Sequence, residues 1–196
     1  MYRCHMVDLA VGTDAAILDA ALVEVLEHGI RRTSATDIAR RAGVSRQTLY
    51  RHWPDLQTLL AALVTRELLA ALPRGAAVAT TCDELVGLLV DTAGAIAELP
   101  LLARLRSTDP ELLARYILQR LGTSQHAIHA ELVGRIEAGQ AAGFVRAGAP
   151  AQLAAMVLLI AQSAIQSAPL VAGWLDEGAW RRELDHALHG YLQARP

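Results

Sequence analysis

Three consecutive side chains near the N-terminus, Arg46, Gln47 and Thr48, carry groups that can read the edges of DNA bases. An arginine can donate two hydrogen bonds to guanine, a glutamine can pair with adenine, and the threonine methyl group can contact the methyl group of thymine. These side chains reach bases only if a helix carries them into the major groove. The flanking sequence must therefore supply that helix and its support.

The surrounding residues predict two short helices joined by a tight turn, over residues 35–42 and 46–53. Ser34 and Ser45 stand at the N-cap positions, and Asp37 completes a capping-box-like pair with Ser34. Ala39 permits a close helix crossing, and Gly43 tolerates the positive φ that the turn requires.

A further helix over residues 14–28 supports this pair. We expect Thr13 to cap it and Gly29 to end it. The apolar residues of the helical pair that pack against it are Ile38, Ala42, Val44 and Leu49. Spacing, caps and burial pattern together predict a helix-turn-helix that binds DNA.

Charge supports this interpretation, because residues 29–54 hold six arginines and one aspartate in a chain whose net charge is −2. A basic patch on a mildly acidic protein suits DNA binding by one segment. The chain contains no lysine, which we attribute to codon usage, so single arginines carry little weight.

Other candidate DNA contacts surround the three base readers. Ser34, Thr36 and Ser45 lie at helix starts, where hydroxyl and N–H groups suit phosphate oxygens. Tyr50, Arg51 and His52 are better placed for phosphates than for bases. Alternatives stay open, because capping is a sufficient role for Ser34 and Ser45, and Tyr50 could pack against the next helix.

The segment from Thr33 to Pro54, which includes Asp-Ile-Ala-Arg-Arg-Ala-Gly-Val-Ser-Arg-Gln-Thr-Leu-Tyr-Arg-His-Trp, resembles the DNA-binding domain of the TetR (TetR/AcrR) family of bacterial repressors. The resemblance covers roughly residues 13–65. It implies an all-helical homodimer whose C-terminal domain binds a ligand that releases the operator.

Two positions depart from the family pattern. Leu56 stands where members commonly carry a phosphate-contacting lysine, and Arg3 is the one basic residue of an N-terminal arm that is often basic. Fewer phosphate contacts would make the salt dependence of DNA binding shallower.

The chain divides into three predicted parts, all α-helical because Leu and Ala dominate and β-branched runs are scarce. They are a DNA-binding domain over residues 8–54, a connecting helix over 55–72, and an effector-binding and dimerisation domain over 73–196. In the last part we expect helices over 83–98, 101–107, 110–140, 150–167 and 177–194.

A regulator of this kind must pair two copies, because the half-sites of an operator lie about one DNA turn, ~34 Å, apart. Two helices of the last part carry apolar stripes that could form the dimer interface. A bundle of four such helices would join two subunits and match a palindromic operator. The alternative is that a stripe faces its own domain. The predicted interface residues are Leu153, Met156, Val157, Ile160, Trp180, Leu184, Leu188 and Tyr191.

The effector is predicted to be small and apolar, because Leu, Ala, Val and Ile would line its pocket. Gln162 and Gln166 share a helix face and could orient the ligand or cross the dimer interface. The candidate pocket residues are Leu63, Leu89, Leu102, His126, Gln162, Gln166 and Trp174.

No cofactor, metal or enzymatic activity is expected. His126 with His129, and His186 with His189, give only two ligands each, whereas zinc sites use three or four. The sequence contains no GxSxG, HExxH or phosphate-loop motif.

Two cysteines and the lack of an apolar N-terminal segment favour the cytoplasm. Residues 147–175 are uncharged and long enough to span a bilayer. Two prolines and several polar residues interrupt them, so we expect a helix at a protein interface rather than a membrane span.

We therefore predict a ligand-responsive transcriptional regulator, a repressor released from double-stranded operator DNA by a small apolar effector. The alternative is a helical interaction module with a degenerate helix-turn-helix, which the missing lysine and sparse arm suggest.

Overall fold

The computed structural model describes residues 3–73, 79–108, 110–111 and 123–194. Every element within these residues is a helix, apart from an isolated antiparallel bridge between Val145 and Gln193. The predicted all-α fold is confirmed.

Contacts divide the chain into two compact units, which we describe separately. The first is Met1–Glu67 with Pro100–Arg120, and the second is Leu68–Leu99 with Leu121–Pro196. The grouping differs from the predicted domains, because α6 (Pro100–Thr108) and most of α4 (Leu56–Ala70) join the N-terminal helices.

The packing of α6 explains this difference. The Arg104 guanidinium donates a hydrogen bond of 3.1 Å to the carbonyl of Glu27 at the end of α1, and Leu101 and Leu105 are buried. The apolar pattern of a short helix shows that one face is buried but does not identify the partner helix.

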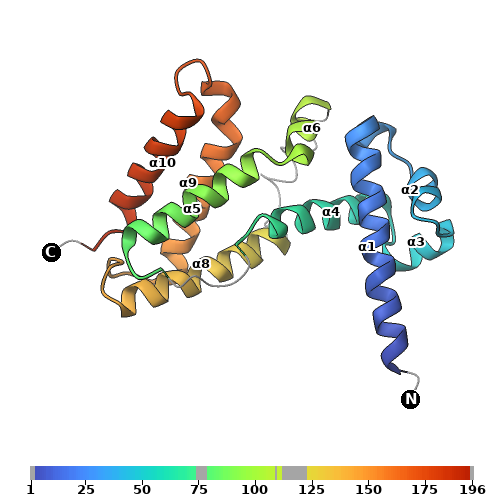
Figure 1. The fold of residues 1–196 in the computed structure, drawn as a ribbon, viewed down its shortest axis with the longest axis horizontal. Helices are drawn as coiled ribbons and strands as arrows, with labels where there is room; N and C mark the ends of the chain where they lie inside the picture. The colour runs from blue at the N-terminus through green and yellow to red at the C-terminus, as the bar shows by residue number, and fades with distance from the viewer. Residues whose placement is uncertain (1–2, 74–78, 109, 112–122, 195–196) are drawn as a thin grey trace. The chain divides into compact units, whose positions relative to one another are not determined.

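Within the described residues, the first unit also contains α1 (Arg3–His28), a 3₁₀ turn (Ile30–Arg32), α2 (Ala35–Arg41) and α3 (Arg46–His52) (Figure 1). The fully buried side chains of Ile17, Val25, Ile38, Leu49 and Leu59 form its centre.

The predicted start of the first helix is wrong, because α1 begins at Arg3 and Thr13 lies inside it. A cap residue begins a helix only where the preceding residues leave the helical conformation. Gly12 directly precedes Thr13, and one glycine weakens a helix without ending it. The predicted end is confirmed, since Gly29 follows α1 with φ of 79°.

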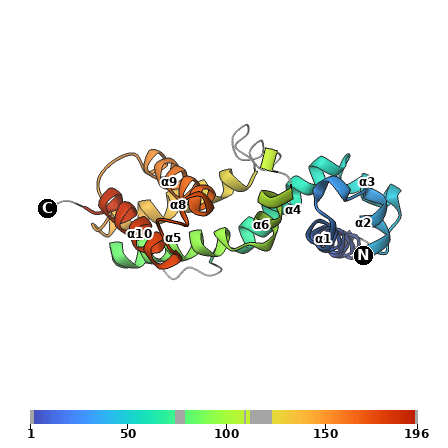
Figure 2. The same ribbon diagram turned by 90° about the horizontal axis from the view of Figure 1, so that it is seen from above.

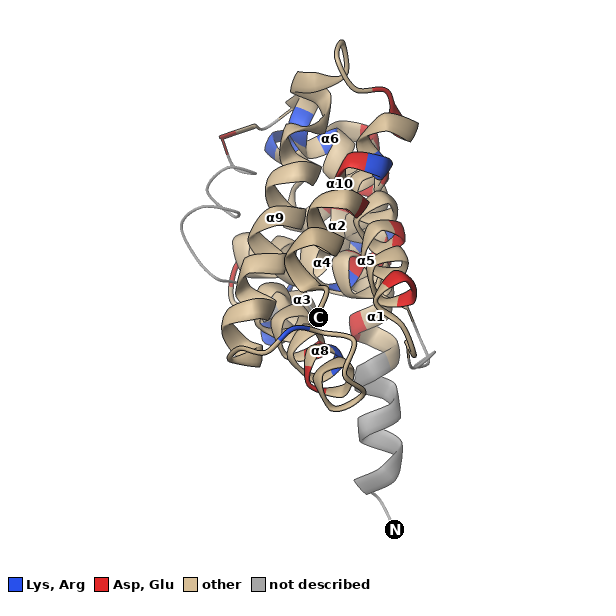
Figure 3. Ribbon diagram, turned by 90° about the vertical axis from the view of Figure 1, so that its left-hand side faces the viewer, with Lys and Arg blue, Asp and Glu red and all other residues tan. Residues whose placement is uncertain are grey.

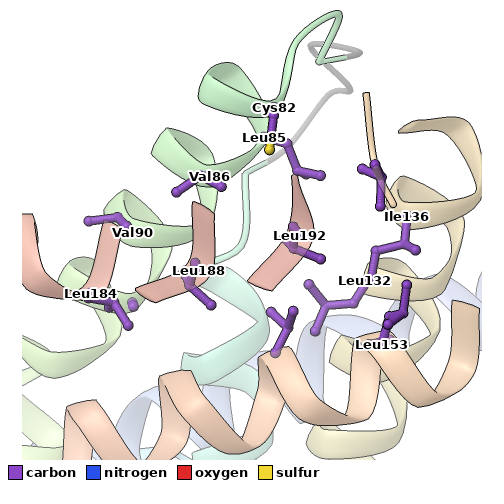
Figure 4. Close-up of a cluster of buried hydrophobic side chains, with 14 of the residues drawn as sticks. Cys82, Leu85, Val86, Val90, Leu132, Ile136, Leu153, Leu184, Leu188 and Leu192 are labelled. Carbon is purple, nitrogen blue, oxygen red and sulfur yellow. The ribbon is translucent and has the colours of Figure 1, made fainter. Parts of the chain in front are cut away.

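The second unit contains α5 (Cys82–Ala97), α8 (Thr123–Ala141), α9 (Pro150–Val171) and α10 (Glu177–Leu192), which lie side by side (Figure 1, Figure 2). Side chains from all four helices meet in one apolar core that includes Val86, Leu132, Leu153 and Leu188 (Figure 4). Most of the predicted helix over 110–140 that precedes Thr123 lies outside the described residues.

Helix α9 runs four residues beyond its predicted end and contains Pro169 in its last turns. It carries no charged residue (Figure 3). By length and composition it could cross a membrane. In the structure it packs against α5, α8 and α10.

Candidate nucleic-acid interface and effector unit

Helix α3, which carries the predicted base readers, is fixed at its start by Ser45. The Ser45 hydroxyl accepts a hydrogen bond of 3.0 Å from the backbone N–H of Thr48 and lies 2.9 Å from the Thr48 hydroxyl. This N-cap satisfies a backbone donor that no intrahelical carbonyl can reach. The predicted cap is confirmed, and the Thr48 hydroxyl takes part in it.

One face of α3 anchors the helix and the other is exposed. Leu49 is fully buried, while Arg46, Gln47, Tyr50 and Arg51 are exposed. These four residues lie on one side of the helix, because positions four apart are neighbours on its surface. The Arg46 guanidinium lies 5.9 Å from the centre of the Tyr50 ring. The structure thus places two of the three predicted base readers, Arg46 and Gln47, on one exposed face, whereas the third, Thr48, is partly buried.

The turn before α3 has the predicted geometry. Gly43 adopts φ of 68°, in the left-handed region that side chains disfavour.

The Ser34 hydroxyl caps α2 by accepting from the Asp37 N–H at 3.2 Å and donating to the Asp37 carboxylate at 2.5 Å. Thr36 is exposed in the first turn of α2.

His52, predicted as a phosphate contact, lies against α1 instead of facing outward with Arg51. Its Nδ1 is 2.5 Å from Oδ1 of Asp14, and its side chain is 16% exposed. The structure therefore gives His52 a role within the unit. Sequence analysis missed the pair, because nothing in the spacing links the start of α1 to the end of α3.

Some arginines of the basic segment, residues 29–54, are neutralised by carboxylates that lie close to them in the structure. Arg41 binds the carboxylate of buried Glu24 at 2.7 Å and that of Glu27 at 2.6 Å, and Arg40 binds Asp37 at 2.7 Å. The Glu24 hydrogen bond contributes most to raising the pKa of Arg41, and Glu27 adds to it. Arg41 therefore connects α2 to α1 rather than presenting its charge to a ligand.

At the start of α4, Asp55 precedes Leu56, the position where the family resemblance implies a phosphate-contacting lysine. Asp55 accepts a hydrogen bond of 2.6 Å from the Thr58 N–H, which lowers the pKa of Asp55. Leu56 is partly buried. This end of α4 therefore carries a capping carboxylate and an apolar side chain rather than a cation.

The predicted pocket residues belong to both units. Leu63 and Leu102 are buried in the first unit, whereas Leu89, Gln162 and Gln166 are partly buried in the second. His126 is exposed, and Trp174 is 85% exposed. Trp174, one of the candidate pocket residues, therefore lines no pocket within the described part of its unit, because the turn after α9 leaves its side chain exposed.

The second unit has a cavity of about 230 Å³ that sequence analysis did not find. It lies at the end of α5, the end of α9 and the start of α10. Its lining residues are Gly94, Ala97, Glu98, Ala168, Ala172, Leu175, Glu177, Trp180 and Arg181.

Five of the eight predicted interface residues are instead part of the core of the second unit. Leu153, Val157, Trp180, Leu184 and Leu188 are buried there. The alternative that a stripe faces its own domain therefore holds for them. Met156 is exposed, and Ile160 and Tyr191 are partly buried.

One histidine of each predicted pair contacts a residue outside the pair. His129 Nε2 lies 2.9 Å from the Ala151 carbonyl, and His189 Nε2 lies 2.6 Å from Asp83. Among the described residues, no three His, Cys, Asp or Glu side chains gather as a metal site would require.

Comparison with known proteins supports the helix-turn-helix. The sequence profile of bacterial regulatory proteins of the tetR family matches residues 17–63. The chain is 42% identical over 187 residues to an uncharacterized HTH-type transcriptional regulator of Mycobacterium bovis, covering 92% of this chain and 94% of the relative. A relative of the same description from Mycobacterium tuberculosis has the same identity and coverage.

Solved structures share the fold. A protein studied for the control of antibiotic production by a bacterial hormone is 26% identical, with a TM-score of 0.62, and the match covers 93% of this chain and 98% of that one. The SmeT–triclosan complex is 20% identical, with a TM-score of 0.57 and coverage of 91% and 89%.

Two observations lead to the same assignment. The structure has a capped helix-turn-helix with an exposed face on α3, and the relatives match over almost their whole length. The chain belongs to the tetR family of bacterial regulatory proteins and is a DNA-binding transcriptional regulator.

Proposed function

We propose that the protein is a homodimeric repressor that leaves a palindromic operator when its second unit binds a small apolar effector. The exposed pair Arg46 and Gln47 on a helix anchored by buried Leu49 is the observation that carries this proposal. Both side chains lie in the first turn of α3, the part of a recognition helix that meets base edges.

Phosphate contacts come from the residues around that face. Arg51 and Tyr50 extend the exposed side of α3, and Thr36 marks the start of α2. Ser34 and Ser45 act first as caps, and the N-termini of their helices suit phosphate oxygens. Thr48 contributes its methyl group to base contacts, since its hydroxyl is part of the Ser45 cap.

The dimer forms through the outer face of α9. Met156 is 44% and Leu159 60% exposed, and this helix has no charge to oppose burial. Ile160 adds partly buried surface next to them. Large exposed apolar side chains on one helix are typical of an interaction surface.

The effector site is proposed to include the partly buried residues Leu89, Gln162 and Gln166 of the second unit. The SmeT–triclosan complex shows that a protein of this fold holds a small apolar molecule. A cytoplasmic location follows from this role. The alternative of an interaction module with a degenerate helix-turn-helix is not favoured, because relatives over 94% of their length are described as transcriptional regulators.

Binding to DNA from around its own gene tests the proposal. Arg46→Ala and Gln47→Ala should each weaken specific binding by about 1–3 kcal/mol and leave nonspecific binding less affected. Arg182→Ala, which removes an exposed arginine from α10, is the charge-matched control and should bind as the wild type does. Unchanged operator affinity in both α3 variants would refute the recognition-helix assignment.

A further inference from the structure

The cavity at the joined ends of α5, α9 and α10 has walls of small and apolar side chains. Ala97 comes from α5, Ala168 from α9, and Leu175 and Trp180 from the turn and helix that follow. All of its lining residues belong to the second unit, so the cavity is defined within one compact body. Such a lining favours the apolar part of a ligand.

Trp180 is held in this wall by a hydrogen bond. Its Nε1 donates to the Ala164 carbonyl at 3.2 Å, and the residue is 8% exposed. The polar atom of the indole is therefore already satisfied. What remains is an aromatic surface, and aromatic rings attract cations as well as apolar groups.

The rim of the cavity carries an excess of negative charge. Arg181 is shared among three carboxylates, with N–O distances of 3.2 Å to Asp91, 3.7 Å to Glu98 and 3.3 Å to Glu177. Two of these acids, Glu98 and Glu177, line the cavity together with Arg181, so its charged lining residues carry a net charge of −1. All three acids are more than 60% exposed, so Arg181 is held by solvent-accessible pairs that a competing cation can replace.

The absence of a side chain at Gly94 lets the Arg181 guanidinium lie against the backbone of α5. A Cβ atom at residue 94 would lie 2.3 Å from Nη2 of Arg181. The guanidinium therefore lies directly on the helix backbone beside the apolar walls, in the position that the charged group of a ligand would take.

We propose that this cavity binds a small organic cation with an apolar body, such as an arylalkylamine. The apolar body lies against Ala168, Leu175 and Trp180, and the ammonium group replaces Arg181 between Glu98 and Glu177. An organic anion is excluded by the net negative rim. The volume of about 230 Å³ limits the ligand to the size of a substituted single ring.

This inference goes beyond the proposed repressor function and does not depend on it. Loss of operator binding in the α3 variants would leave it unaffected, and failure of cation binding would leave the DNA-binding assignment in place.

The test is an NMR titration of the full chain that follows its three tryptophan indole signals, assigned with single Trp→Phe variants. The probes are benzylammonium, neutral benzyl alcohol and anionic benzoate. Benzylammonium should shift the Trp180 signal saturably, and benzoate should not. The exposed Trp174 signal reports nonspecific binding to aromatic surface within the same sample.

Charge variants locate the binding site. Glu98→Gln and Glu177→Gln should each raise the Kd for benzylammonium by about two- to fivefold, as expected for exposed ion pairs. Arg181→Gln should lower that Kd, because it removes the competing cation. Glu183→Gln, an exposed α10 acid outside the lining, is the matched control. Ala168→Leu should abolish binding by filling the cavity.

The proposal is overturned if benzylammonium shifts Trp174 and Trp180 alike without saturation, if benzoate binds as well as benzylammonium, or if the Glu98 and Glu177 variants keep the wild-type Kd. Thermal melts of every variant show that a lost signal is not lost folding.

Discussion

The side chains of Asp14 in α1 and His52, the last residue of α3, lie in contact, with an Oδ1–Nδ1 distance of 2.5 Å. The His52 ring also lies against Trp53, with 5.9 Å between ring centres. The pair ties the C-terminal end of the recognition helix to the first helix, while Ser45 fixes the other end. Together these contacts determine how α3 is presented.

Removing this tie should loosen α3 more than it destabilises the whole chain. Asp14→Asn should lower the free energy of unfolding by less than about 1 kcal/mol, because the Asp14 side chain is 45% exposed and solvent screens the pair. Operator affinity should fall as well. A double-mutant cycle with His52→Gln, measured by thermal unfolding and DNA binding, gives the coupling between the two residues. A coupling of zero in both measurements would show that the pair has no energetic role.

Arg40 and Arg41 are neighbours in sequence with different partners, so they provide a matched comparison. Arg41→Met leaves buried Glu24 without its guanidinium, and an unsatisfied buried group costs about 1–3 kcal/mol. Arg40→Met breaks an exposed pair with Asp37 and should change Tm little. Thermal unfolding measures both, and equal Tm values would contradict the assignment of Arg41 to the α1–α2 contact.

The first unit was the most predictable from sequence, because its determinants are local. Ser34, Ser45 and Gly43 act on backbone atoms within a few residues, so the cap or turn that each one forms depends mainly on neighbouring sequence. The exposed positions of α3 follow from helical periodicity once Leu49 is recognised as buried.

The features that sequence analysis missed depend on contacts between residues far apart in the chain. Periodicity showed that Leu153, Leu184 and Leu188 share an apolar stripe, but a core and an interface have the same stripe. Glu24 and Asp14 lie outside residues 29–54, the segment whose charges were summed in the sequence analysis. Their contacts with Arg41 and His52 could therefore not be predicted from that segment. The cavity at Trp180 joins the ends of three helices and has no local signature.

The Ser45 cap should contribute measurable stability. Ser45→Ala should lower the free energy of unfolding by about 1 kcal/mol, and Ser45→Gly by only a few tenths, because glycine is itself tolerated at an N-cap. Chemical denaturation distinguishes the two. Ser163→Ala, an exposed serine within α9, is the control for loss of a hydroxyl group. Equal losses in the Ala and Gly variants would argue against a capping role.

Asp37 should report on the Ser34 cap through its ionisation. The Ser34 hydroxyl contributes most to lowering the pKa of Asp37 below its usual 3.8, and Arg40 lowers it further. Because the folded-state pKa is depressed, the stabilisation is present above the unfolded value and is lost as pH falls through the lower folded value. Ser34→Ala should therefore raise the pKa of Asp37 toward 3.8 in an NMR titration. The stability difference between the two proteins should shrink below about pH 4. An unchanged Asp37 pKa in the variant would rule out the hydrogen bond as its cause.

The outer face of α9 should hold the dimer together. Leu159→Glu places a charge on the most exposed large apolar side chain within the uncharged stretch before Pro169, and burial of that charge would oppose association. Sedimentation should show a monomer, with weaker operator binding because two half-sites are no longer joined. Gln152→Glu adds the same charge at an exposed position in the first turn of α9 and is the control for charge alone. Leu188→Ala, by contrast, removes a fully buried side chain and should cost about 2–5 kcal/mol of stability. The prediction is wrong if the dimer persists in Leu159→Glu but dissociates in Leu188→Ala before that variant unfolds. That result would indicate that the dimer interface includes the apolar stripe of Leu188, which the structure places in the core.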